Sequence, residues 1–437
     1  MEIMTKNMRA GAGRSIITPP LGTKLYGYPT IRPATSIHDD LRVTCIALEY
    51  DQTRAMLISA DICSFKGESC DRLRLLISAE TGILAENIIF CSTHTHSGPA
   101  TSALAGWGVS DTAYIQDILQ PQAVKAAKAA CADLRPAQLG VGTTKSDIGI
   151  NRRQLNRDGS IALGQNPWGP YDPEMTVLSF RTPDKKPIAN LIHYCCHGTA
   201  AGCNPEVTRD WSGPMVDCLE EQSGALTVFF NGAEGDIGPR LPNGLTIGNL
   251  QLALSLGARA GIDAVRAWRV VKEYRDVLVK AITREIRLPY KPLSDLAIAK
   301  AEMAKLGDPG KLAGMEMKMY AKWQQVVAEH SSGQAPKKNF CFKQTIIAIG
   351  PVAFIPFPFE VFMEITLRIR CHSPYQHSLC LCNSNGSLGY FPTREQFVRG
   401  GYETTVTRFT NTYELTEDAD DRAVEENLKL LEALNET

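Results

Sequence analysis

Short hydrophobic runs alternate along this chain with longer segments of helical periodicity. Residues 55–60 form an apolar run of strand length, residues 68–81 place apolar side chains at helical spacing, and residues 88–91 are again mostly apolar. A strand, a helix and a second strand in this order predict a crossover between parallel strands. We therefore expect a partly parallel sheet here.

The same alternation continues to the end of the chain. Further strands are expected at residues 41–49, 138–143, 176–180, 188–194, 227–230, 340–349, 352–357 and 379–382. Helices are expected at residues 113–132, 246–269 and 417–434, with two more between 293 and 330. The pattern predicts an α/β fold with a mixed, partly parallel β-sheet core and helices outside. Because no segment is a clear linker, we expect a single domain over residues 1–437 with a helical insertion at about 293–335.

Histidines and carboxylates directly follow several of these predicted strands. They are His94 and His96, His197, Glu234 and Asp236, and Glu360. Ligands of open α/β sheets bind outside the carboxyl ends of the strands, so these side chains are expected to meet there. Imidazole and carboxylate groups suit a catalytic zinc ion with three protein ligands and an open position, which lowers the pKa of a bound water to about 7. The residue types thus favour metal-assisted hydrolysis.

The charge balance narrows the class of partner. The chain has 46 Lys and Arg against 47 Asp and Glu residues, and no run of Lys or Arg is longer than two. This argues against nucleic acid or an anionic membrane as the main partner and favours a small-molecule substrate.

Cysteine usage and hydropathy indicate the compartment. The 13 cysteines include no Cys-x-x-Cys pair, so neither a disulfide framework nor a zinc ribbon is indicated. The N-terminus has no apolar signal region, and no segment approaches the length of a transmembrane helix. We expect a cytoplasmic protein that does not insert into membranes.

Two other families of metal hydrolases carry motifs that this chain does not match. A metallo-β-lactamase would extend His-x-His with an Asp-His pair, but Ser97-Gly98 follows here. A binuclear metallophosphatase would contain an Asn-His-Asp or Asn-His-Glu element, which the sequence lacks. Both assignments are therefore disfavoured.

An ordered series of motifs resembles the neutral/alkaline non-lysosomal ceramidase family. The series consists of Thr93-His94-Thr95-His96-Ser97-Gly98-Pro99, Asn151-Arg152, His197-Gly198-Thr199, Gly235-Asp236-Ile237-Gly238-Pro239, Pro358-Phe359-Glu360, Tyr390 and Tyr402. The resemblance covers residues 9 to 410 approximately, and it implies the fold of the ceramidase catalytic domain with one zinc ion. It implies zinc ligation by His94, His197, Glu360 and Tyr390. It also implies that His96, Arg152 and Tyr402 contact the substrate carbonyl group or stabilise its oxyanion.

The chain departs from that family in two respects. Gly238 stands where ceramidases have a serine regarded as the nucleophile, so a serine acyl-enzyme is not expected. The chain ends at Thr437, and we expect it to lack the immunoglobulin-like C-terminal domain of full-length ceramidases. Both departures argue against ceramide as the substrate.

These observations lead to one main hypothesis and two alternatives. The main hypothesis is a zinc-dependent hydrolase that cleaves an amide or ester bond of a soluble small molecule by attack of zinc-bound water, with Glu234 or Asp236 taking the proton of the water. One alternative is a carbohydrate esterase or N-deacetylase on the same scaffold. The other is a non-catalytic binding protein that retains zinc.

Overall fold

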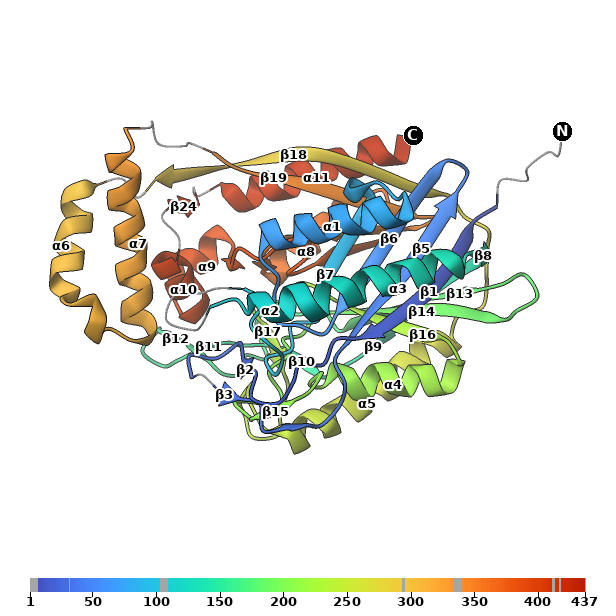
Figure 1. Cartoon of the computed structure of the whole chain (residues 1–437), viewed down its shortest axis with the longest axis horizontal. Helices are drawn as coiled ribbons and strands as arrows, with labels where there is room; N and C mark the ends of the chain where they lie inside the picture. Colours follow the sequence, from blue (N-terminus) through green and yellow to red (C-terminus); the bar gives the residue numbers. More distant parts are fainter. Residues whose placement is uncertain are drawn as a thin grey trace.

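The structure, a computed structural model, describes residues 7–30, 32–102, 109–292, 295–333, 339–410, 413–415 and 418–436. Its centre contains three β-sheets of four or five strands (Figure 1). The first sheet has the order β7 (Ile88–Ser92), β6 (Thr53–Ala60), β5 (Arg42–Tyr50), β1 (Arg9–Ile16) and β8 (Arg135–Pro136). The second has the order β16 (Leu226–Asn231), β14 (Pro187–Tyr194), β13 (Glu174–Arg181) and β9 (Gln138–Lys145). The third has the order β22 (His377–Leu381), β20 (Val352–Pro356), β19 (Asn339–Ile349), β18 (Val279–Pro292) and β24 (Tyr413–Leu415).

A hydrophobic core lies between the three sheets. Residues on β5 alternate between its two faces, as expected for a strand that is buried on both sides. Ile46 and Leu48 belong to the core shared with the other two sheets, whereas Cys45 and Ala47 belong to the cluster beneath the helices that cover the first sheet. The sheets are therefore packed on both faces.

Six helices cover the outer faces of the sheets (Figure 1). α1 (Gly67–Thr81) and α3 (Gln120–Ala132) pack on the first sheet. α4 (Ser212–Ser223) and α5 (Leu250–Arg269) pack on the second. α8 (Met363–His372) and α11 (Ala419–Glu436) pack on the third.

Parallel strand pairs bring loops from distant parts of the sequence to one edge. β6 pairs in parallel with β7, β14 with β16, and β20 with β22. The second and third sheets meet at this edge, where the main-chain N–H of Cys382 donates to the carbonyl of Asn231 over 3.1 Å. The segments that follow these strands therefore gather at a single place in the molecule.

The predicted fold class is confirmed, and several element boundaries are corrected. The crossover from β6 through α1 to β7 is present. The helix expected at 113–132 is divided into α2 (Thr112–Tyr114), a π-helical turn η2 (Ile115–Leu119) and α3. The helix expected from residue 246 begins only at Leu250, where the Asn249 side chain caps it by accepting from the N–H of Leu252.

Several elements were not predicted, among them α4, β18, α8 and α10 (Tyr402–Thr410). The expected helical insertion corresponds to α6 (Leu296–Leu306) and α7 (Gly314–Ser331), which stand side by side at one end of the molecule in Figure 1. α7 packs against α10.

Candidate active site

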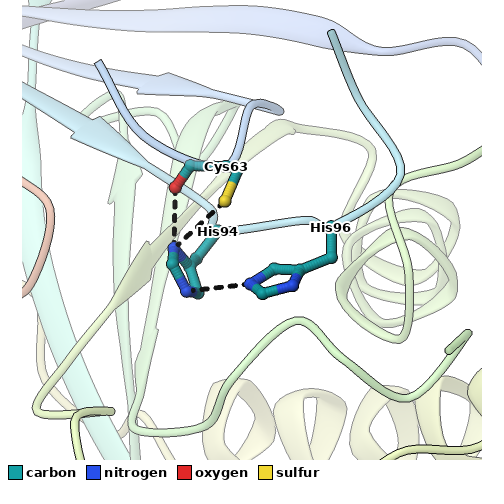
Figure 2. A group of neighbouring side chains, drawn as sticks. All are labelled: Cys63, His94 and His96. Atoms are coloured by element: carbon teal, nitrogen blue, oxygen red, sulfur yellow. Dashed lines mark hydrogen bonds between the residues drawn. The ribbon is translucent and has the colours of Figure 1, made fainter. Parts of the chain in front are cut away.

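His94 and His96 lie in the loop that follows β7, and both turn toward the same space (Figure 2). His94 has a φ of 66°, a left-handed conformation that is unusual outside glycine and common at functional sites. Its Nδ1 lies 2.7 Å from the carbonyl oxygen of Cys63, so Nδ1–H donates there and Nε2 carries the lone pair, which faces His96. The Nε2 atoms of His94 and His96 are 3.1 Å apart.

His197 follows β14 and presents the same nitrogen. Its Nδ1 donates to the carbonyl of Glu234 over 2.7 Å, which leaves Nε2 free. Gly198 allows this segment to approach the first histidine closely, because a Cβ at this position would lie 2.3 Å from the His94 carbonyl oxygen. The carbonyl of Gly198 also accepts from the N–H of His96 over 3.1 Å. Main-chain contacts thus fix the three imidazoles relative to one another.

Glu360 completes the cluster from the segment that follows β20. It begins β21 (Glu360–Val361), which pairs in parallel with β23 (Tyr390–Phe391) so that Glu360 lies opposite Tyr390. The Glu360 carboxylate Oε2 is 3.1 Å from His197 Nε2 and 3.7 Å from His94 Nε2. The Tyr390 ring is stacked on that of His197 with centroids 6.4 Å apart. The structure therefore brings together the four residues expected to bind zinc.

The electrostatics of this cluster favour a bound cation. Burial, followed by the charge of Arg152, lowers the pKa of His197 to about 3, and burial also lowers the pKa of His94. Burial raises the pKa of Glu360, but interactions with His94, His197 and Arg152 outweigh it and hold this pKa at about 2. Because these imidazoles are neutral, the positive charge of Arg152 is the interaction that keeps Glu360 ionised.

Burial lowers the pKa of both imidazoles, so they are neutral, and the carbonyl that accepts from each Nδ1 places the single proton there. His94 Nε2, His197 Nε2 and an ionised Glu360 then converge as potential donors, and neither His197 Nε2 nor Glu360 Oε2 has a hydrogen-bond partner. This is the donor set that zinc prefers, with each histidine held by a carbonyl on its other nitrogen.

Glu234 offers a second way to group potential ligands, since it lies near His94 and His197. Its Oε1, however, is 3.8 Å from His94 Nδ1, the nitrogen that already donates to Cys63. The Glu234 carboxylate accepts from the side-chain amides of Asn231 and Asn383, the latter over 2.8 Å. It therefore lies behind His94, on the side away from Nε2.

Asp236 is also engaged within the protein. Its Oδ1 accepts from the N–H of Met363 over 2.8 Å, and its Oδ2 accepts from the side chain of Asn151 over 3.0 Å. The main-chain carbonyl of Asp236 accepts from the N–H of Arg152. Burial, above all, raises the pKa of its carboxyl group to about 7. Asp236 thus ties the loop of Arg152 to the segment that follows Glu360.

Arg152 reaches the cluster through Tyr390. Its Nη2 donates to the Tyr390 hydroxyl over 3.0 Å, and its Nε donates to Glu403 over 2.8 Å. Glu403 also accepts from Arg153 Nη1 over 2.6 Å and has no exposed surface. Tyr402, its neighbour at the start of α10, has its ring centroid 6.1 Å from that of Tyr390. Glu403 was missed in the sequence because an isolated glutamate in an unpredicted helix carries no signal.

A prominent surface cavity lies elsewhere. It has a volume of about 500 Å³ and is lined by residues that include Tyr50, Lys280 and Gly350. These residues lie at the end of β5, at the start of β18 and in the turn between β19 and β20, far from the histidines. The candidate active site is therefore defined by its chemistry and not by the size of a cavity.

Comparisons with known proteins identify the family of the chain. The family model for neutral/alkaline non-lysosomal ceramidase, N-terminal, matches residues 8–242, which is more than half of the chain. The chain belongs to this family. It is accordingly a hydrolase.

Solved ceramidases share the fold over nearly the whole chain. The neutral ceramidase from Pseudomonas aeruginosa is similar with a TM-score of 0.76 at 19% identity, covering 98% of this chain and 75% of that one. A ceramidase complexed with C2 is similar with a TM-score of 0.74 at 18% identity, covering 98% and 76%. No curated protein matches this chain. Within the described part of this ceramidase-family chain, no helix has the length and apolar character needed to cross a bilayer.

Proposed function

We propose that this ceramidase-family hydrolase is a zinc enzyme that cleaves an amide or ester bond of a small polar molecule. The observation that carries the proposal is the convergence of His94 Nε2, His197 Nε2 and Glu360 Oε2, in which the carboxylate oxygen lies 3.7 Å and 3.1 Å from the two nitrogens. Tyr390, held by Arg152 beside these groups, is the proposed fourth ligand. A zinc ion held there supplies a Lewis acid that polarises a carbonyl group and lowers the pKa of water.

The remaining groups of the site suit a carbonyl substrate. Arg152 is positively charged and is oriented by Glu403, so it can stabilise negative charge that develops on the carbonyl oxygen. We assign the hydroxyl of Tyr402 the same role, because this residue begins the helix that carries Glu403. His96 has a buried Nδ1 without a partner and can hold a proton or hydrogen-bond to the substrate.

We propose attack by water without a covalent acyl-enzyme. Gly238 has no hydroxyl group, and a Cβ at this position would lie 2.7 Å from the Cβ of Thr246. The site therefore lacks space there for a nucleophilic serine. We assign Glu234 and Asp236 to positioning, since their oxygens accept hydrogen bonds from the amides and main-chain groups that hold His94 and Arg152.

The test compares substrates and metal states in one assay. Protein purified without added metal is offered short-chain N-acyl and O-acyl polar compounds, sugar acetates and detergent-dispersed ceramide, before and after chelation and zinc return. We expect hydrolysis of the first group that chelation abolishes and zinc restores. His197→Ala should lose this activity, whereas the matched control His38→Ala, at an exposed histidine, should keep it. Preference for ceramide would refute the proposed substrate class, preference for sugar acetates would favour a carbohydrate esterase, and zinc binding without turnover would indicate a binding protein.

A further inference from the structure

Arg32 contacts the main chain of His96. It begins β3 (Arg32–Pro33), which pairs with β2 (Lys24–Leu25). Its Nη2 donates to the main-chain carbonyl of His96 over 2.7 Å. Its guanidinium lies over the ring of Tyr28, 4.8 Å from the centroid, and the Tyr28 ring meets that of His96 edge-on at 5.0 Å.

The backbone of this loop is fitted closely to the active-site histidine. Gly27 has a φ of 111°, and a Cβ at this position would lie 2.4 Å from the His96 ring. Only the side chain of His96 consequently separates Tyr28 and Arg32 from the proposed zinc site.

The guanidinium of Arg32 is buried but not neutralised. Only 6% of the residue is exposed, and Nε and Nη1 have no hydrogen-bond partner. Within the described ranges, no carboxylate lies at ion-pair distance from it. Residues 103–108, which follow the His-x-His loop, read Ala-Leu-Ala-Gly-Trp-Gly and contain no acidic residue. An unpaired buried charge is costly, so a built-in cation of this kind points to an anionic ligand.

The other arginines near the site differ from Arg32. Arg152 and Arg153 share Glu403, and Arg209 pairs with Asp39 and Asp217. Carboxylates of the protein already neutralise these cations, so an anionic substrate would stabilise them less than it would stabilise Arg32.

Tyr28 supplies a second donor without a partner. Its hydroxyl oxygen is buried and makes no hydrogen bond. Burial, followed by the charge of Asp210, raises the pKa of this hydroxyl, so it remains protonated. Asp210 itself accepts from the main-chain N–H groups of Ala200, Ala201 and Trp211. The Tyr28 proton is therefore available to a ligand.

We propose that Arg32 and Tyr28 form a subsite for a carboxylate group of the substrate. This deepens the proposed function and rests on it: the substrate class becomes N-acyl or O-acyl compounds with a carboxylate a few bonds from the scissile carbonyl, as in N-acyl amino acids. One uncompensated positive charge matches one carboxylate, and the planar guanidinium suits its geometry. The main-chain contact of Arg32 to His96 couples occupancy of this subsite to the position of His96.

The kinetic test uses a substrate pair of similar size in which a neutral amide replaces the carboxylate, with release of acetate as the readout. N-acetylglycine and N-acetylglycinamide share the acyl group and the scissile bond, and only the first has a carboxylate. We expect kcat/KM to favour the acid by about 10- to 100-fold, the range of a charge-assisted hydrogen bond. Arg32→Met should bring this ratio close to one, whereas Arg32→Lys should keep part of it. A merely structural role of Arg32 would lower both rates equally and leave the ratio unchanged, which would overturn the proposal.

A binding measurement separates failure of the subsite from failure of the proposed function. Calorimetry of N-acetylglycine with metal-free protein should give at least about tenfold tighter binding than N-acetylglycinamide, and Arg32→Met should remove this difference. The matched control is Arg181→Met, since Arg181 also lies over a tyrosine ring, that of Tyr274, but on a distant strand. Selective binding without turnover would support the subsite and refute hydrolysis. Equal turnover and equal binding of the two compounds would support hydrolysis and refute the subsite.

Discussion

Replacing Glu403 with glutamine removes a buried carboxylate shared by two guanidinium groups. Arg153 keeps other partners, because its Nε donates to the Gln396 side chain over 3.0 Å and its Nη2 donates to the Gly400 carbonyl over 2.5 Å. Arg152 loses its charged partner and keeps the Tyr390 hydroxyl. Breaking a buried ion pair costs about 3–5 kcal/mol, so Glu403→Gln should lower the free energy of unfolding by that amount.

The same change should reduce catalysis. Without Glu403, Arg152 is no longer fixed, and a misplacement of about 1 Å in an active site can cost roughly 10²-fold in rate. We expect kcat to fall by this order while KM changes less, since Arg152 is proposed to stabilise charge that develops during the reaction.

Denaturant titration and steady-state kinetics measure the two effects. The double variant Arg153→Met with Glu403→Gln restores the original charge balance and should recover part of the lost stability, which gives a coupling energy. Glu80→Gln is the control, because Glu80 pairs with Lys128 at the exposed surface and its loss should change little. If Glu403→Gln lowers the free energy of unfolding by less than about 1 kcal/mol and shows no coupling to Arg153, the Glu403 carboxylate does not hold the two guanidinium groups as proposed.

Three further substitutions test the roles of single residues. Burial, opposed by Arg209, raises the pKa of Asp61 from 3.8 to about 6, so the folded state binds the proton more tightly and its stability falls as pH rises through about 4 to 6. Asp61→Asn should remove this loss, worth roughly 2–3 kcal/mol between pH 3 and 8 in denaturant titrations, and an unchanged pH profile would contradict the assignment. Gly198→Ala should cost several kcal/mol, about 3 or more, and lower zinc content, because its Cβ would meet the His94 carbonyl; full metal content would argue against this contact. Glu234→Gln should lower stability by about 1–3 kcal/mol yet retain turnover, and complete loss of activity with zinc still bound would instead make Glu234 the proton acceptor.

The sequence predicted the α/β fold because most strands are buried on both faces and therefore read as continuous apolar runs. It failed for β18, whose sequence Val279–Pro292 includes charged and proline residues, since much of that strand is partly exposed. It failed for α4 and α10 because their polar residues face neighbouring segments that sequence periodicity does not reveal. The π-helical turn at Ile115–Leu119 also has no signature in hydrophobic spacing.

The sequence predicted those residues of the candidate site that lie at the ends of strands. His94, His96, His197 and Glu360 follow apolar runs, and parallel pairing brings those ends together. The strand ends alone did not distinguish Glu360 from Glu234, and only the family resemblance did, because the difference depends on which side of His94 each carboxylate occupies. Arg32 and Glu403 act through contacts with residues distant in the sequence, and such contacts leave no local pattern.

The proposed function depends on one zinc ion held by His94 Nε2, His197 Nε2 and Glu360 Oε2. A crystal of protein purified without added metal, measured on both sides of the zinc absorption edge, tests it directly. We expect one strong anomalous difference peak within reach of these three atoms and the Tyr390 hydroxyl. A peak held instead by Cys63, or none there with zinc bound elsewhere, would contradict it.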